Sequence, residues 1–259
     1  MESSVPYIIC FYWEGDRWQR EGSGIKPTDR RSHILMQKMG KADNTLPEKY
    51  INNLYRGVER FVDRPFKFVC FTNCDFDLDE GIEIRDFNPP TKKGVLPRIW
   101  MFSPEAGLAG HQVLCLDLDV VIVDNLKPLL DYNGIFAGRG RFKSGYEHQL
   151  DGDIMSFKAG EKAEKIFWNP FIENVEEVEK YTGGRERYWI RKQTESFADF
   201  WNDVAPDAVV SYKWHVQRKN RKLVIPNLRK PPEGASIVSC HGVPRPHRID
   251  DNWIKEYWK

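Results

Sequence analysis

One apolar run near the middle of the chain limits the possible folds more than any other feature. It spans residues 111–123 and reads HQVLCLDLDVVIV, with Asp117 and Asp119 as its two acidic positions. A continuous apolar segment of this kind is typical of a central strand with both faces covered. Such coverage requires helices on both sides of a sheet, so we expect an α/β fold with a mostly parallel central sheet.

Other segments alternate between helix and strand patterns, which supports that sheet. Apolar residues recur at helical spacing over residues 44–62 and 193–204. We also expect a short helix at LPRIWMFSPE and a helical stretch over residues 161–181 that Pro170 interrupts. β-branched and aromatic residues predict strands at VPYIICFYW, FKFVCFTN, GIEIRDF, IFAGRG, DGDIMSFKAG, AVVSYKWHV, KLVIP and SIVSCHG.

Length and composition favour a single domain. The 259 residues suffice for one α/β domain over residues 1–259. The 39 Lys+Arg and 38 Asp+Glu nearly cancel, so the net charge provides no overall attraction to nucleic acid or anionic lipid. Five cysteines without zinc-finger spacing predict a reducing, cytoplasmic compartment. The apolar segment 5–13 is too short for a signal peptide or a membrane span, so we expect neither. The oligomeric state stays open.

The aspartates of the apolar run are the strongest candidate site. Alternation along a continuing strand would send Asp117 and Asp119 to opposite faces, so they can share a ligand only where the strand ends. Ligands of α/β sheets usually bind at such strand ends. A buried carboxylate needs a counter-charge, which leaves two explanations: a shared divalent cation, or a structural pair with arginine or lysine.

Several segments resemble glycosyltransferases of the GT-A type. The carboxylate pair lies in VLCLDLDVVIVDNLKPLLDY, which is similar to their Asp-x-Asp (DxD) segment, with residues 126–130 as its short helix. A family of bacterial and phage glycosyltransferases is similar at further landmarks, namely FYW, FVCFTN, LPRIW, DGDIMSF, VSYKWHV and CHGVPRPH. The resemblance covers nearly the whole chain. It implies a Rossmann-like GT-A domain that binds a nucleotide-diphospho-sugar with Mn²⁺ or Mg²⁺.

The resemblance also suggests residues for the metal and the donor. It implies Asp119 as chiefly a metal ligand, and Asp117 as a contact of both metal and donor. CHGVPRPH is distantly similar to the His-x-x-Gly-x-x-Lys-Pro-Trp ending of retaining, glycogenin-like enzymes. We therefore expect His241 as a third metal ligand, because a neutral imidazole suits Mn²⁺. His247 is the alternative ligand, and Ser239 occupies the family's histidine position.

Donor contacts beyond the metal are expected at five positions. Gly242 lets backbone approach the diphosphate, which Arg245 then binds. Arg98, where relatives often carry lysine, and Lys213 are candidates for further phosphate contacts. Trp13 is a candidate for stacking on the nucleobase. The alternatives are an exposed helical arginine, a solvated lysine and a core tryptophan.

Candidate catalytic residues lie in two segments. Asp151 falls where relatives often carry an asparagine that faces the reacting sugar, and Asp153 follows it by two, so either carboxylate could meet the acceptor hydroxyl. A solvated turn is the alternative for both. Glu186 and Arg187 stand where relatives commonly read Asp-Gln. Glu186 is therefore the third candidate, and the acceptor side departs from the family pattern.

These observations predict metal-dependent transfer of a sugar, UDP-linked and with retained configuration, to an acceptor hydroxyl. The acceptor can be a glycan, a small molecule or a modified nucleic-acid base. The basic residues at 213, 218, 219, 221 and 222 favour a solvated loop over a nucleic-acid surface. One rival is a haloacid-dehalogenase-like phosphatase, although Val120 stands where that motif carries threonine or glycine. Another rival is a non-catalytic nucleotide-sugar-binding module.

Overall fold

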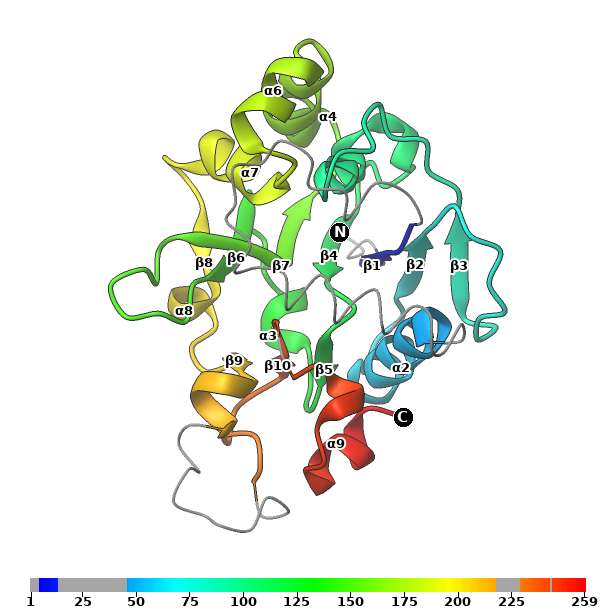
Figure 1. Cartoon of the computed structure of the whole chain (residues 1–259), viewed down its shortest axis with the longest axis vertical. Helices are drawn as coiled ribbons and strands as arrows, with labels where there is room; N and C mark the ends of the chain where they lie inside the picture. Colours follow the sequence, from blue (N-terminus) through cyan, green and yellow to red (C-terminus); the bar gives the residue numbers. More distant parts are fainter. Residues whose placement is uncertain (1–4, 14–45, 218–228, 243) are drawn as a thin grey trace, which may run out of the picture.

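The structure is a computed structural model that describes residues 5–13, 46–217, 229–242 and 244–259. Seven of the described strands form a central sheet in the order β3-β2-β1-β4-β7-β6-β8, and three more form a second sheet in the order β5-β10-β9 (Figure 1). The strands are β1 (Tyr7–Phe11), β2 (Lys67–Phe71), β3 (Ile82–Arg85), β4 (Gln112–Leu116), β5 (Val120–Ile122), β6 (Phe136–Gly140), β7 (Leu150–Lys158), β8 (Asp199–Phe200), β9 (Val209–Ser211) and β10 (Ile237–Ser239).

The central sheet is mixed but mostly parallel, as the sequence predicts. Four of the six pairings among its described strands are parallel, and β7 runs antiparallel to both β4 and β6. Because β7 is reversed, its first residues lie beside the last residues of β4 and β6. This reversal brings the ends of three strands together at one edge of the sheet.

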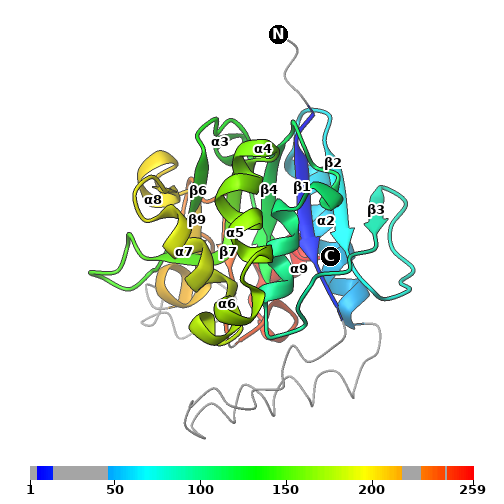
Figure 2. The same ribbon diagram turned by 90° about the horizontal axis from the view of Figure 1, so that it is seen from above.

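Helices cover both faces of the central sheet (Figure 2). They are α2 (Leu46–Phe61), α3 (Lys127–Leu130), α4 (Glu161–Ala163), α5 (Asn169–Ile172), α6 (Val175–Thr182), α7 (Glu186–Thr194), α8 (Trp201–Val204) and α9 (Asn252–Tyr257). Short 3-10 helices are η3 (Leu96–Phe102), η4 (Pro104–Ala106) and η8 (Pro246–Arg248), and π-helical segments are η5 (Glu164–Trp168) and η6 (Tyr212–Gln217). None of the described helices combines the length and apolar character that a membrane-spanning helix needs.

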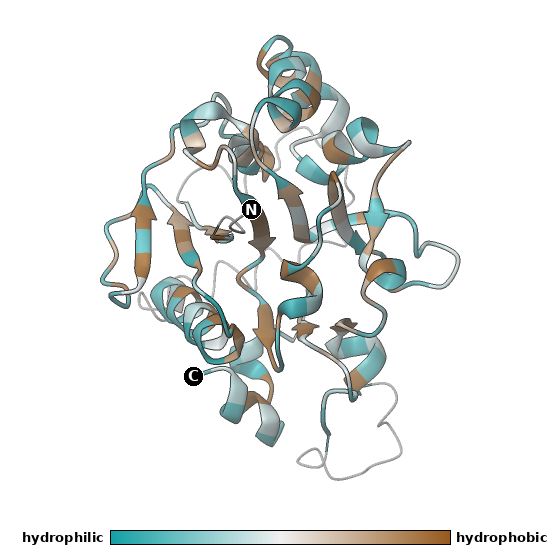
Figure 3. Ribbon diagram, turned by 180° about the vertical axis from the view of Figure 1, so that it is seen from behind, coloured by the Kyte–Doolittle hydropathy of each residue, from teal (hydrophilic) through white to brown (hydrophobic). Residues whose placement is uncertain are grey.

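Alternate residues of the central strands feed two hydrophobic cores. In β1, Ile9 and Phe11 pack with the core formed by η3, η5 and α5–α7, whereas Ile8 and Cys10 pack with α2 and α3. Figure 3 shows apolar residues concentrated on the strands, while the helices carry hydrophilic residues beside apolar ones. Burial on both faces explains why these strands read as continuous apolar runs.

The long apolar run is divided between the two sheets, which corrects the expectation of one central strand. It forms β4 up to Leu116, turns at residues 117–119, and continues as β5 in the second sheet, antiparallel to β10. A hydrogen bond of 3.3 Å from the Val120 amide to the Asp117 carbonyl closes the turn. The pleat therefore breaks at the aspartates, as a shared site requires.

Two helical expectations are wrong. Residues 193–204 do not form one helix, because α7 ends at Thr194 and β8 pairs with β6 before α8 begins. Pairing with a sheet edge outweighs the apolar spacing there. Pro170 does not interrupt the preceding helical stretch either. It follows the π-helical segment η5 directly, within a helical stretch that is continuous over residues 161–172, and the break comes at residues 173–174.

Most of the other expected elements are confirmed. Residues 44–62 contain α2, and LPRIWMFSPE forms η3 and η4 rather than an α-helix. AVVSYKWHV is a strand only in its first part, because η6 follows β9 directly. The strand expected at KLVIP lies outside the described residues.

The contact of α2 with the second sheet yields a test. A Cβ atom placed on Gly57 would lie 3.2 Å from the Cβ of Ile122 in β5. We expect Gly57→Val to destabilise the protein by about 1–3 kcal/mol through overpacking. Ile122→Ala removes the Cγ1 atom that would lie 3.3 Å from the new Cβ, so in urea unfolding it should cost less stability in Gly57→Val than in the wild type. Equal or higher stability of Gly57→Val would show that α2 does not pack this closely on β5.

Candidate functional site

Polar and charged side chains gather at the edge of the sheet where β4 and β6 end and β7 begins. Leu116, the last residue of β4, lies opposite Ile154, and Gly140, the last residue of β6, lies opposite Leu150. The Asp117 amide donates to the Asp153 carbonyl at 2.8 Å. The turn after β4 is thus attached to the first residues of β7, and both bring carboxylates to this edge.

Arg98 connects two carboxylates beneath this edge. Its Nη1 lies 2.8 Å from Asp117 Oδ1 and 2.9 Å from Glu186 Oε1, and its Nη2 donates to Cys115 Sγ at 3.3 Å. Burial alone would lower the pKa of Arg98, but Asp117 and other neighbours raise it above its ordinary value. Arg98 is only 5% exposed, so it is a buried ionic contact and not an exposed helical arginine.

Asp119 lies at the other end of the turn and is 8% exposed. Its Oδ2 forms an ion pair with Arg245, while its Oδ1 is buried and has no hydrogen-bond partner within the described residues. Its carbonyl accepts from the Cys240 amide at 3.0 Å, which attaches the turn to the end of β10. Burial lowers the pKa of Arg245, an effect that Tyr50 and Asp117 partly offset.

Arg139 holds both carboxylates of β7. Its Nε forms an ion pair with Asp153, and its Nη2 lies 3.1 Å from Asp151 Oδ2. The second oxygen of Asp153 accepts from Ser239 Oγ at 2.7 Å, and Asp151 Oδ1 lies 3.1 Å from Arg187 Nη1. Burial would raise the pKa of Asp151, but Arg139 and Arg187 hold it below its ordinary value. Both aspartates are paired residues, not the solvated turn considered from the sequence.

His241 occupies a neighbouring position but does not join the aspartates. Its Nε2 lies 2.9 Å from Ser211 Oγ, and its ring stacks on Phe142 at 5.6 Å. Burial, with a further contribution from Arg139, lowers the pKa of His241 to about 4, so the imidazole is neutral at pH 7. Among the described residues, no three His, Cys, Asp or Glu side chains form a group that could hold a metal. The expected ligand set of Asp117, Asp119 and His241 is therefore not assembled.

His247 does not supply that third ligand either. Its Nδ1 lies 2.6 Å from the Tyr50 hydroxyl on α2. The oxygen donors that remain are the two carboxylates of the turn, and the buried Asp119 Oδ1 lacks a partner among the described residues. Oxygen donors of this kind suit Mg²⁺ or Mn²⁺. The turn thus fits a divalent cation bound by two protein carboxylates, in competition with the arginines that now contact them.

The remaining donor candidates differ in their surroundings. Gly242 has a φ of +76°, in the left-handed region that favours glycine, and a Cβ there would lie 2.6 Å from Lys213 Nζ. Burial lowers the pKa of Lys213. Trp13 is 5% exposed and packs edge-on against Phe87 in the core. Its stacking on a nucleobase stays a prediction.

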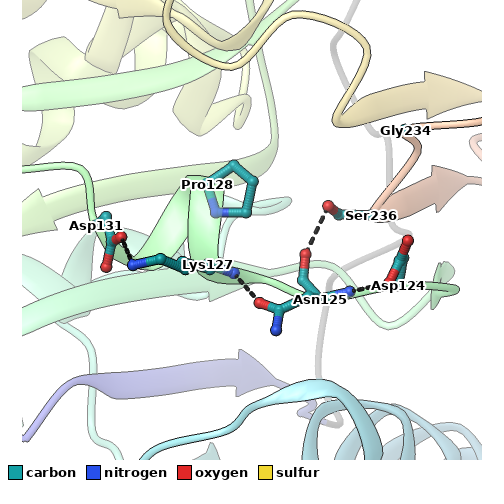
Figure 4. A pocket seen from close by; sticks show the side chains of 7 residues that line it. All are labelled: Asp124, Asn125, Lys127, Pro128, Asp131, Gly234 and Ser236. Carbon is teal, nitrogen blue, oxygen red and sulfur yellow. Dashed lines mark hydrogen bonds and ion pairs between the residues drawn. The ribbon is translucent and has the colours of Figure 1, made fainter.

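A separate pocket lies at the far end of β5. Figure 4 shows this pocket, whose volume is about 470 Å³ and whose lining residues are Asp124, Asn125, Lys127, Pro128, Asp131, Gly234 and Ser236. None of the predicted site residues lines it. The residues of the candidate site therefore meet elsewhere, around the turn between β4 and β5.

Sequence reasoning missed two members of the site. Arg139 interrupts the apolar strand segment IFAGRG, and a buried arginine there implies a carboxylate partner. That signal was available, because DGD follows in the next strand segment. Ser211 gives no comparable signal, because its contact with His241 joins the ends of two strands far apart in sequence.

Comparison with known proteins identifies the fold. No protein-family model matches the chain, and no curated protein is significantly similar in sequence. The solved galactosyltransferase LgtC, in complex with donor and acceptor sugar analogs, is 12% identical with a TM-score of 0.56, over 96% of this chain and 93% of LgtC. The glycosyltransferase GlyE of Streptococcus pneumoniae TIGR4 is 12% identical with a TM-score of 0.59, over 98% of this chain and 60% of GlyE. The bifunctional glycosyltransferase WbbM is 10% identical with a TM-score of 0.51, over 95% of this chain and 47% of WbbM. The expected GT-A fold is confirmed.

The buried ion pairs of Arg139 can be tested by stability. Arg139→Met leaves Asp151 and Asp153 without their shared counter-charge, and we expect a loss of about 3–5 kcal/mol. Arg64→Met, which removes the more exposed ion pair with Asp131, should cost about 0–1 kcal/mol. Urea unfolding of both variants measures the difference. Similar small losses would mean that the Arg139 pairs are not buried ion pairs of this kind.

The neutral state of His241 predicts a pH dependence. The folded protein holds the pKa of His241 at about 4 against an ordinary 6.5, so the unfolded chain takes up the proton first as pH falls. The free energy of unfolding is therefore highest above pH 6.5 and falls by at most about 3 kcal/mol as the pH drops toward 4. Urea unfolding without metal should show a shallower decline below pH 6.5 for His241→Gln. Parallel curves for the variant and the wild type would contradict it.

Proposed function

We propose that this chain transfers a sugar from a UDP-sugar or a related nucleotide sugar to an acceptor hydroxyl, with Mn²⁺ or Mg²⁺ as cofactor. The observation that carries the proposal is Asp119. It is a buried carboxylate with one unpartnered oxygen among the described residues, next to Asp117 at a sheet edge where ligands of α/β folds bind. The glycosyltransferase fold supports the same reading.

Asp117 and Asp119 would hold the cation through their oxygens. A bound divalent cation supplies positive charge to the leaving nucleoside diphosphate without any proton transfer. Arg98 holds Asp117 in position through the 2.8 Å contact between Nη1 and Oδ1, and Glu186 holds Arg98 through a second ion pair. The turn is therefore preorganised by buried partners, which limits the reorganisation that binding requires.

Arg245, Lys213 and Gly242 are the proposed contacts of the donor diphosphate. Arg245 now neutralises Asp119, and a cation at that carboxylate would compete with it. The released guanidinium would then lie beside the diphosphate, with which it forms a two-pronged contact. Lys213 lies next to Gly242, where the absence of a Cβ atom lets other groups come close to the backbone.

The engagement of the acidic residues supports retention of the anomeric configuration. An inverting reaction needs a carboxylate that is free to take the acceptor proton. Asp153 has both oxygens bonded, Asp151 is shared by two arginines, and Glu186 is 6% exposed and contacts Arg98. We therefore assign them positioning roles around the reacting sugar.

The proposal includes a cytoplasmic location. All five cysteines lie in the described residues, and none forms a disulfide. Four of them are buried as small core side chains. Unpaired thiols of this number support a reducing compartment.

Asp119→Asn tests the proposal. We expect UDP with Mn²⁺ to raise the melting temperature of the wild type, and Asp119→Asn to lose that effect and about a hundredfold or more in turnover. Asp124→Asn, an exposed aspartate of the separate pocket, is the matched control and should change neither. Nucleotide sugars without effect, together with binding or hydrolysis of a phosphomonoester, would replace this function by a phosphatase. NMR of the fresh glycoside product reports retention or inversion.

A further inference from the structure

Three arginines gather around Tyr188 at the start of α7. This arginine cluster consists of Arg185, Arg187 and Arg191. The guanidinium carbons of Arg185, Arg187 and Arg191 lie 5.5, 5.5 and 5.4 Å from the centroid of the Tyr188 ring. Burial lowers the pKa of Arg191, and the charges of Arg141 and Arg187 lower it further. The positive charge of Arg191 is therefore close enough to those of Arg187 and Arg141 to be repelled by them.

The described residues supply little negative charge to balance the cluster. Asp151 lies 3.1 Å from Arg187, but it is already shared with the buried Arg139. Arg191 Nε donates to the Leu150 carbonyl at 2.6 Å, and Arg185 Nη1 donates to the Tyr188 hydroxyl at 3.2 Å. Within the described part of the chain, no carboxylate forms an ion pair with these two arginines or with Arg141. The cluster thus carries surplus positive charge.

Folding alone does not account for this arrangement. Arg185 is the N-cap of α7 and Arg187 lies in its first turn, where positive charge opposes the helix dipole. Arg187 and Arg191 are four residues apart, a spacing at which like charges destabilise a helix. The Nε of Arg187 is also buried without a hydrogen-bond acceptor among the described residues. These costs are offset if an anion binds here.

The cluster borders the candidate active site on the side away from the donor diphosphate contacts. Arg187 contacts Asp151 at the start of β7, and the adjacent Glu186 contacts Arg98, the partner of Asp117. Figure 1 shows α7 at the upper end of the central sheet, and β9 and β10 at its lower end beside β5. The proposed diphosphate contacts belong to the β9–β10 side. An anion at the cluster would therefore belong to a second substrate.

We propose that the arginine cluster binds an oxyanion, a phosphate or a carboxylate, carried by the acceptor, so that the acceptor is a negatively charged sugar derivative. The inference rests on the proposed glycosyltransferase function. Arginine forks match both oxyanions and bind them with two parallel hydrogen bonds. The Tyr188 hydroxyl among the guanidinium groups offers a further polar contact.

Binding of three probes tests the proposal without requiring turnover. Glucose, glucuronate and glucose 6-phosphate are titrated by calorimetry into enzyme saturated with UDP and Mn²⁺, so that the diphosphate contacts are already filled. We expect at least one anionic sugar to bind at least about tenfold more tightly than glucose, and Arg191→Gln to abolish that preference. The preferred anion identifies the oxyanion as phosphate or carboxylate. Arg185→Gln should act in the same direction.

Lys192→Gln is the matched control, because Lys192 lies on the same helix but faces the rings of Tyr181 and Trp189. It should leave the preference unchanged. Equal binding of all three sugars, no binding of either anion, or equal losses in Arg191→Gln and Lys192→Gln would overturn the proposal. A lower UDP affinity in Arg191→Gln would assign the cluster to the donor instead. If UDP itself does not bind, the proposed function fails, and titration of the sugars into the nucleotide-free enzyme still tests the cluster.

Discussion

The structure depends on the pairing of two buried arginines with carboxylates at one edge of the sheet. Asp117 and Glu186 share Arg98, and Asp151 and Asp153 share Arg139. The two arginines, Asp153 and Glu186 are buried, and an unpaired charge among them would cost several kcal/mol. The Arg98 pairs join η3 and α7 to the turn after β4, and the Arg139 pairs join β6 to β7.

The turn between β4 and β5 joins the two sheets as well as the two aspartates. Leu116 ends the central sheet and Val120 begins the second, so the residues between them leave both hydrogen-bond ladders. Backbone contacts from Asp117 to Asp153 and from Cys240 to Asp119 secure this turn to both sheets. Carboxylates that would alternate along a strand can therefore face the same region.

The same ion pairs connect stability to function. Arg245 neutralises Asp119 where the proposed cation would bind, and Arg98 contacts Asp117 on its buried side. A cation bound at the turn would replace Arg245 as the partner of Asp119, while Arg98 would keep its contact with Asp117. The arginine cluster of α7 differs, because its charges have few protein partners within the described residues. Surplus charge of one sign beside a paired network is consistent with two substrates of different anionic character.

The sequence by itself determined the α/β class and the helix α2, because apolar periodicity acts over a few neighbouring residues, and it required a strand end if Asp117 and Asp119 were to share a ligand. It also indicated that buried carboxylates need partners. Only the tertiary structure decided which partners they have. Arg139 reaches Asp153 across adjacent strands, Ser211 meets His241 between strand ends, and residues 199–200 pair with β6 instead of continuing a helix. These contacts depend on strand order and register, which bring together residues that no local pattern links.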